Sequence, residues 1–151
     1  NAIVDWVFLE LRNRHDKSQV IATTVGLVQR DGDIVSHRGD SLLTFPIIYQ
    51  NEYYVSVRHR NHICMVSSQP HTFTNRRIPM LDFTRMETAG SYAGRQMAAQ
   101  NTMWAGDMNH DNKVVYQGPN NDRANLLFNT ILKHPDNPNK FSNFIIYSGG
   151  N

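Results

Sequence analysis

The sequence predicts a mainly β protein, in which an antiparallel β-sandwich is followed by a small helical calcium-binding module. Two observations predict the sandwich. Apolar and polar residues alternate along several short segments, and these segments recur roughly every ten residues with turn residues between them. A third observation, an Asp- and Asn-rich loop before a helical pattern, predicts the module. We therefore expect a sandwich in residues 1–83 and a connector with a calcium-loop module in residues 84–151.

The sandwich segments alternate or are rich in β-branched residues. Val7, Leu9 and Leu11 occupy every second position, which is the period of a half-buried strand. The turn at 30–33 contains a glycine and predicts a hairpin. Pro46 favours an edge or a bulge for the segment that contains it. The expected strands are 7–11, 20–29, 34–35, 41–49, 53–58 and 63–67.

The pattern changes after Phe83. Residues 84–101 contain two glycines and no alternation, so we expect a connector with one short helix. Leu127 and Ile131 have a helical spacing, which predicts a helix capped by Asn or Asp at 120–122 and ended by residues 133–135. We expect these two side chains, with Trp104, to pack the helix onto the sandwich. The final apolar segment is 144–147.

Composition narrows the class of function. The chain has 151 residues, of which 40% are hydrophobic and 19% charged, so a core can form without disulfide bonds. Its 15 basic and 13 acidic residues are scattered, which argues against a nucleic-acid partner. No apolar run is long enough for a membrane span, and Cys64 has no second cysteine to pair with. The sequence opens at Asn1 rather than Met, so we expect a processed protein or an excised piece of a longer one.

The most informative motif lies in residues 107–115. Asp107, Asn109 and Asp111 place oxygen-bearing side chains at positions 1, 3 and 5 of a loop. Position 7 of such a loop contributes its backbone carbonyl, which here belongs to Lys113. This all-oxygen set favours Ca²⁺ over zinc or copper.

The closing ligand of this loop is displaced. An EF-hand-like loop has a carboxylate at position 12, where this chain has Gly118. We expect Asp122, after a four-residue insertion, to fold back over the ion as the closing ligand. Asn112 replaces the usual glycine at position 6, and asparagine is the next best residue for a left-handed backbone. The alternative is an Asn- and Asp-rich surface turn that binds no metal.

A resemblance enters with these residues. Residues 104–114 resemble the calcium loop of dockerin-type modules. The run through residue 123 resembles, more narrowly, the C-terminal modules of large secreted surface proteins of Bacteroidota, in which a strand similar to residues 53–62 belongs to a preceding β-sandwich. The similarity covers most of the chain. It implies a non-catalytic, calcium-bound, extracellular protein that acts in adhesion, matrix building or surface display, and we expect an immunoglobulin-like or prealbumin-like sandwich.

One departure from the dockerin pattern bears on the partner. A dockerin carries two calcium loops, whereas this chain has one complete loop and only a remnant at Asp136, Asn137 and Asn139. We therefore do not expect cohesin binding. We expect self-association or contact with neighbouring surface proteins, in which the apolar first strand, residues 2–11, adds to a neighbouring subunit of a filament or matrix.

Two alternatives to this structural role remain open. A carbohydrate-binding or cell-adhesion module could use an aromatic surface, since flat rings stack on sugars, although cross-strand core pairs are the simpler reading of these rings. Arg38-Gly39-Asp40 is also a tripeptide that some adhesion receptors bind. The aromatic candidates are Trp6, Phe8, Tyr49, Tyr53 and Tyr54.

A hydrolase or transition-metal centre is the third alternative. His59 and His62 form an HxxH motif, and His15, His37 or His71 could complete it. Residues three apart point to opposite faces of a strand, so the pair can chelate only if a turn intervenes. Cys64 has no orienting group besides His62, which favours a buried structural residue over a nucleophile.

Overall fold

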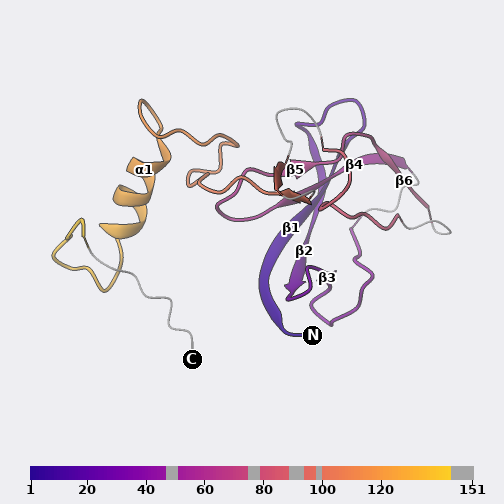
Figure 1. Ribbon diagram of the computed structural model, residues 1–151, viewed down its shortest axis with the longest axis horizontal. Coiled ribbons are helices and arrows are strands. Elements are labelled where there is room, and N and C mark those ends of the chain that lie inside the picture. The colour runs from indigo at the N-terminus through magenta and orange to yellow at the C-terminus, as the bar shows by residue number, and fades with distance from the viewer. Residues whose placement is uncertain (47–50, 75–78, 89–93, 98–99, 144–151) are drawn as a thin grey trace.

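The structure, a computed structural model, describes residues 1–46, 51–74, 79–88, 94–97 and 100–143. Its strands and helices are shown in Figure 1. In chain order they are β1 (Ile3–Asn13), β2 (Val20–Gln29), β3 (Ile34–Val35), β4 (Asn51–Arg58), β5 (Met65–Val66), β6 (His71–Phe73), β7 (Arg95–Met97), β8 (Gln100–Thr102), α1 (Asp122–Asn125) and the π-helical η2 (Leu126–Ile131).

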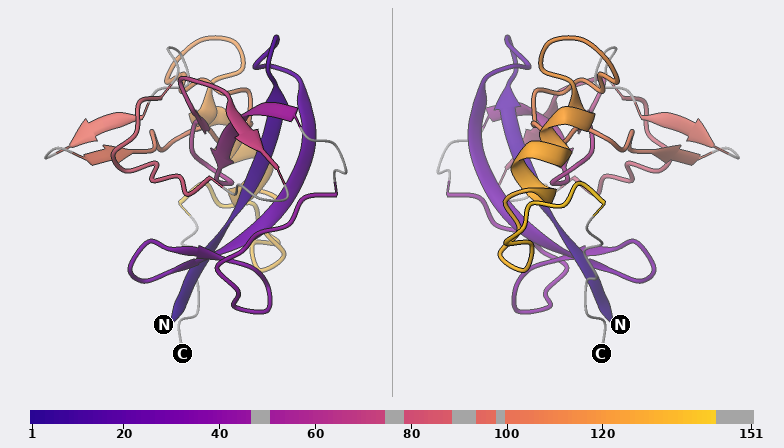
Figure 2. Two further views of the ribbon diagram at one scale, coloured as in Figure 1. Left: turned by 90° about the vertical axis from the view of Figure 1, so that its right-hand side faces the viewer. Right: turned by 90° about the vertical axis from the view of Figure 1, so that its left-hand side faces the viewer.

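Strands β1 to β6 form one curled antiparallel sheet (Figures 1 and 2). Its order is β3-β2-β1-β4-β5, and β6 also pairs with β4. Leu9 in the middle of β1 lies opposite Thr24 of β2 and Val57 of β4. Strands β7 and β8 form a separate two-stranded sheet. The mainly β class is thus confirmed.

The core lies on one face of this sheet. Alternate residues of β1 and β4 are buried there, as the sequence pattern predicts. Among the described residues, side chains from irregular segments rather than a second large sheet pack over this face. The buried strand residues are Val7, Leu9, Leu11, Tyr53, Val55 and Val57, and the residues that cover them include Leu43, Phe45, Leu81 and Phe83.

The predicted strand at 41–49 is wrong over residues 41–46, which are irregular. Their alternation has another cause, because Leu43 and Phe45 pack on the core instead of joining a strand ladder. Residues 47–49 lie outside the described part of the chain. The other expected strands correspond to β1, β2, β3, β4 and β5, with β5 shorter than predicted.

The connector after Phe83 returns to the sheet. Its described residues contain the β7-β8 hairpin rather than the expected short helix. Backbone hydrogen bonds join it to the sheet region at Ser68 N to Glu87 O, 3.1 Å, and at Ile63 N to Trp104 O, 2.8 Å. The last such bond runs from Gly106 N to Asn61 O, 2.9 Å. The chain therefore stays bonded to the sheet up to the first residue before the predicted calcium loop.

The predicted helix is present, and its cap is one of the three expected. The Asn121 side chain accepts a hydrogen bond from Ala124 N, and α1 continues into η2 up to Ile131. Figure 1 shows this helix apart from the sheet. Leu127 and Ile131 are half-buried, and Trp104, the third residue expected in this contact, is 46% exposed. The expected packing of the helix onto the sheet is therefore not observed.

Candidate metal centre

The predicted calcium loop begins with a tight backbone turn. Gly106 has φ of +116°, a conformation that other residues rarely adopt, and a side chain there would also lie 3.1 Å from Val114. The next residue, Asp107, is only 1% exposed. Gly106 thus positions an aspartate at the centre of the loop, where its carboxylate is surrounded by backbone.

Side-chain oxygens at positions 1, 3 and 5 accept hydrogen bonds from the backbone that follows each of them. The Asp107 carboxylate accepts hydrogen bonds from Asp111 N at 3.1 Å and from Asn112 N at 3.0 Å. Asn109 Oδ1 accepts from Asp111 N at 3.1 Å, and Asp111 Oδ1 accepts from Lys113 N at 2.9 Å. These are successive Asx turns, in which a short side chain replaces a backbone acceptor. The motif therefore folds as a compact loop around the buried carboxylate of Asp107, while Asp111 is exposed.

Two residues of the loop adopt the left-handed backbone conformation. Asn112, at the position of the usual EF-hand glycine, has φ of 62°, as predicted. His110, two residues earlier, has φ of 63° and is exposed. His110 therefore projects away from the loop and is not placed as a ligand.

Asp122 returns to the loop despite the insertion. Its carboxylate accepts hydrogen bonds from Met108 N at 2.8 Å and from Val115 N at 2.6 Å, and its own N–H donates to Val115 O at 2.9 Å. The side chain is 5% exposed. The expected fold-back of Asp122 is therefore present, while its role as a metal ligand stays a prediction.

Burial alone would raise the pKa of Asp122. The hydrogen bonds from the backbone N–H groups of Val115 and Met108 offset this effect and hold its pKa below the usual value. Asp122 is therefore an ionised, buried carboxylate, whose charge is balanced in the described structure by peptide dipoles.

The inserted segment 116–121 forms a turn that returns the chain to the helix. Gly118 and Asn120 have positive φ, at 103° and 57°. Asn109 Nδ2 donates to Asn120 O at 3.1 Å, and Asn121 Nδ2 donates to Gly118 O at 2.7 Å. The insertion thus places the helix N-terminus directly beside the loop.

The oxygen set fits a hard cation in chemistry and partly in arrangement. Asp107, Asn109, Asp111, Asp122 and the Lys113 carbonyl supply only oxygen, and a carboxylate oxygen that accepts one N–H keeps further acceptor capacity. Asp111, however, is exposed. Across the described ranges, no three His, Cys, Asp or Glu side chains gather into a group that could hold a metal ion. Binding would therefore require Asp111 to turn inward.

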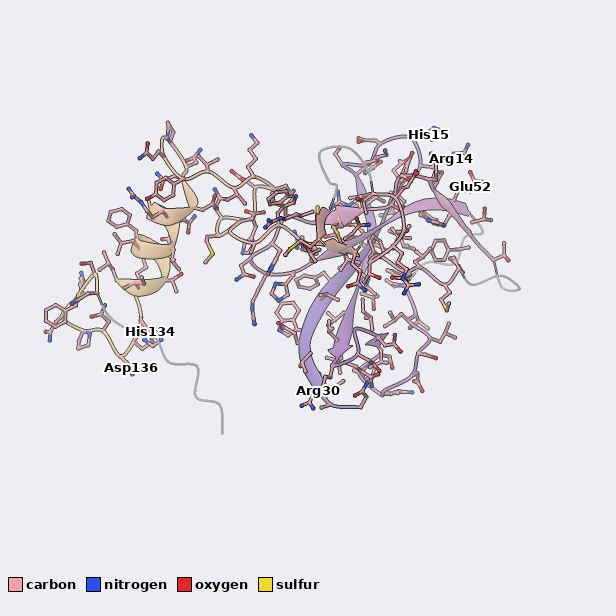
Figure 3. The ribbon with its side chains drawn as sticks, in the orientation of Figure 1. Arg14, His15, Arg30, Glu52, His134 and Asp136 are labelled. Carbon is pink, nitrogen blue, oxygen red and sulfur yellow. The ribbon has the colours of Figure 1, made fainter. Side chains whose placement is uncertain are left out.

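In the remnant of a second calcium loop expected at residues 136–139, Asn137 has a structural role. Asn137 is 3% exposed, and its Nδ2 donates to Ile131 O and Phe141 O, both at 2.9 Å. Phe141 N donates back to Asn137 Oδ1 at 2.9 Å. Asn137 thus ties the turn after the helix together. Figure 3 shows Asp136 beside His134 at this end of the helix.

The HxxH pair meets because a turn intervenes after the strand. β4 ends at Arg58, so His59 already belongs to a turn that brings it to His62. The two Nδ1 atoms are 2.8 Å apart. His59 Nε2 also lies 3.0 Å from Asp5 Oδ2 of β1, a partner that the sequence analysis did not identify. The sequence indicates this contact only weakly, because all it shows is that Asp5 and His59 are polar residues in or next to predicted strands.

A buried ion pair was also missed. Glu10 and Arg12 on β1 are 3% and 5% exposed, and Arg12 Nη2 lies 2.7 Å from Glu10 Oε2. Arg12 Nη2 also lies 3.5 Å from Cys64 Sγ. Burial raises the pKa of the fully buried Cys64 thiol, and Arg12 offsets this only in part. Cys64 is therefore a buried residue, as expected, but in a charged environment.

The proposed aromatic surface is only partly assembled. Tyr53 is 5% exposed and belongs to the core, and Tyr49 lies outside the described residues. Trp6 and Phe8 pack edge to face, with ring centroids 5.1 Å apart, and Tyr54 lies under Lys17. The sheet thus uses most of these rings for its own packing.

The Arg38-Gly39-Asp40 tripeptide occupies an exposed turn. Gly39 has φ of +87°, and Ser36 N donates to Asp40 O at 2.8 Å. The Ser36 and Asp40 side chains also interact, at 3.3 Å. A turn requirement therefore accounts for the glycine.

No family model, curated protein sequence or solved structure matches the chain. No helix in the described part of the chain has the length and apolar character needed to cross a membrane.

Proposed function

We propose that this chain is a non-enzymatic extracellular protein, stabilised by calcium, with a structural or adhesive role. In this proposal residues 1–83 form an immunoglobulin-like or prealbumin-like sandwich domain, and residues 84–151 form a connector with a dockerin-like calcium module. Subunits associate with each other or with neighbouring surface proteins. The single observation that supports the proposal best is the loop 107–122, in which Asp107 and Asp122 are buried at either end.

The electrostatics of the loop favour a cation. Asp107 and Asp122 are both at most 5% exposed, and no basic side chain forms an ion pair with either among the described residues. Backbone N–H groups balance these charges only as partial dipoles. A calcium ion held by Asp107, Asn109, Asp111, Lys113 and Asp122 would neutralise them and fix the helix N-terminus against the loop.

Removal of calcium tests the proposal. With free calcium at about 100 times its dissociation constant, the bound ion would stabilise the folded module by about 2.7 kcal/mol. We expect chelation to lower the melting temperature of the full chain, as measured by calorimetry. Asp107→Ala should abolish this response, and Asp107→Asn should reduce it while keeping a hydrogen-bond acceptor in place.

The matched control is Asp136→Asn, since Asp136 is an exposed acid outside the loop. This variant should keep the full response to calcium. An identical melting curve for the unmodified chain with calcium and with chelator would contradict the proposal, as would an equal response in the Asp107→Ala and unmodified chains.

A further inference from the structure

The turn after β4 brings two histidine rings into contact. His59 and His62 have ring centroids 4.7 Å apart and an interplanar angle of 70°, and their Nδ1 atoms are 2.8 Å apart. A backbone hydrogen bond from His62 N to His59 O, 3.4 Å, closes the turn. Both residues are half-buried. The pair is therefore held by the backbone and does not depend on two mobile surface side chains.

Asp5 of β1 fixes the orientation of the first ring. Its Oδ2 lies 3.0 Å from His59 Nε2, and its Oδ1 accepts a hydrogen bond from Trp6 N at 2.9 Å. An ionised Asp5 can only accept a hydrogen bond, so Nε2 carries the proton and Nδ1 of a neutral His59 keeps its lone pair.

The side-chain oxygen of Asn61 is a third potential metal ligand close to His59 Nδ1. Its Oδ1 lies 3.0 Å from His59 Nδ1. Its backbone carbonyl is held by Gly106 N at 2.9 Å, which limits how far the turn can move. His62 Nδ1 and Asn61 Oδ1 thus both lie within 3.0 Å of His59 Nδ1.

The distances select a coordination geometry. Two donor atoms that are 2.8 or 3.0 Å apart, each about 2.0–2.1 Å from one ion, subtend about 85–95° at that ion. A tetrahedral zinc ion would need a separation of roughly 3.3 Å at the same bond length. Angles near 90° between nitrogen and oxygen ligands are those of a tetragonal site, which suits Cu²⁺ or Ni²⁺.

We propose that His59, His62 and Asn61 form a binding site for a divalent transition-metal ion of tetragonal geometry, with Cu²⁺ preferred. Asp5 is a positioning residue, because it holds the outer nitrogen of a ligating histidine as second-shell carboxylates do in known metal sites. Water occupies the remaining positions. This site is separate from the calcium loop and does not depend on the proposed function.

Backbone contacts join the proposed metal-binding turn to another part of the chain. His62 forms an isolated β-bridge with Ala105, and Ile63 N donates to Trp104 O at 2.8 Å. The same turn therefore carries the segment that leads into the calcium loop. A metal ion bound at this turn would stabilise the attachment of the C-terminal module to the sheet.

Copper binding to the full chain tests the proposal. Cu²⁺ is titrated at neutral pH in excess calcium, which competes with copper for the acidic loop, and binding is followed by calorimetry and electron paramagnetic resonance. We expect one equivalent with hyperfine structure from two nitrogens. His59→Gln and His62→Gln should each weaken binding at least about tenfold, and Asp5→Asn by about 10–100-fold. His15→Gln is the matched control, because His15 is exposed and lies near the opposite end of β1, and it should bind as the unmodified chain does.

Asn61→Asp provides a test by gain of affinity, since it places a carboxylate where the amide oxygen lies and should tighten binding. Circular dichroism checks that each variant is folded. The proposal is overturned if the unmodified chain shows a spectrum without two nitrogen ligands. It is equally overturned if folded His59→Gln and His62→Gln variants bind copper as tightly as the His15→Gln control.

Discussion

Single buried polar residues organise much of this molecule. Asp107, Asp122 and Asn137 are each at most 5% exposed, and each is surrounded by backbone groups that it hydrogen-bonds. A buried polar group without a partner would cost about 1–3 kcal/mol, so these contacts largely determine the conformation of the chain around them. Residues 107–143 contain few buried apolar side chains, and their order depends on such contacts instead.

Cys64 gives a prediction at the same scale. The thiol is fully buried, and its pKa is raised by that burial. Because only the thiolate reacts readily, we expect alkylation of the native chain at pH 8 to be at least about a hundredfold slower than in urea. Alkylation at comparable rates in both states would contradict this picture.

The same shift has a consequence for stability. The folded thiol keeps its proton at a pH where the unfolded thiol, with a pKa near 9.0, has lost it. The unfolded state is therefore favoured increasingly as the pH rises above about 9. Cys64→Ala should remove this part of the alkaline loss of stability, as measured by urea titration at pH 8 and pH 10.

Among the elements, β1 lies between β2 and β4 and is buried on both of its faces. Its residues Val7, Leu9 and Leu11 face the core, while Glu10 and Arg12 are buried on the opposite face. Arg12 also donates to Lys17 O at 3.0 Å, and Arg58 Nε lies 3.4 Å from Glu10 Oε1. β1 is thus buried on both faces, as a central strand is, although one face is charged.

Breaking this ion pair should destabilise the sheet. Arg12→Leu leaves Glu10 buried without its main partner, and we expect a loss of about 3–5 kcal/mol in the free energy of unfolding. The double variant Glu10→Leu with Arg12→Leu removes both charges and should lose less than the single variant. Urea titration of both variants measures the difference.

The control for this pair is an exposed ion pair on the same sheet. Arg14 Nη1 lies 3.0 Å from Glu52 Oε2, with both side chains more than 40% exposed (Figure 3). Arg14→Leu should cost less than about 1 kcal/mol. If Arg12→Leu lowered the free energy of unfolding by no more than Arg14→Leu does, the buried ion pair would not be important for the stability of the sheet.

The limits of prediction follow from the range of the interactions. Alternation identified β1, β2 and β4, and the spacing of Asp107, Asn109 and Asp111 identified the loop, because both patterns are local. Charged residues such as Glu10 and Arg12 would be expected to face solvent. Their burial could not be predicted from local sequence, because it depends on distant residues such as Cys64. The expected strand 53–58 ends at the same residue as β4, but the contact of His59 with Asp5 could not be predicted, because the two residues are 54 positions apart in the sequence.

At the scale of the whole molecule, the first half of β1 pairs with β2 on one side and with no described strand on the other. The ladder with β4 begins at Phe8, and no described strand pairs with Ile3–Val7 on that side. Ile3 and Val4 are 48% and 57% exposed. An exposed apolar edge with unpaired backbone groups can accept a strand from another subunit. Among the described residues of the first strand, only Ile3–Val7 lack a strand on this side. The segment proposed to pair with another subunit is therefore shorter than the residues 2–11 expected from the sequence.

Assembly through this edge can be tested by electron microscopy and sedimentation. If subunits associate by strand addition, the full chain in calcium should form ordered polymers, and Val4→Lys should prevent them by burying an unpaired charge. Met80→Lys is the control, because Met80 is 98% exposed and lies outside the strands. Polymers that form equally in the Val4→Lys chain would exclude this edge.

The junction between the sheet and the C-terminal module also determines how the molecule would respond to force. Short backbone contacts join residues 61–63 to residues 104–106, whereas β1 and β2 pair over a long ladder. Tension applied through the C-terminal region would load these few bonds one after another. The loop and helix would then detach from the sheet at a lower force than the force that unfolds the sheet. The junction would therefore limit the force that reaches the sheet from the C-terminal region.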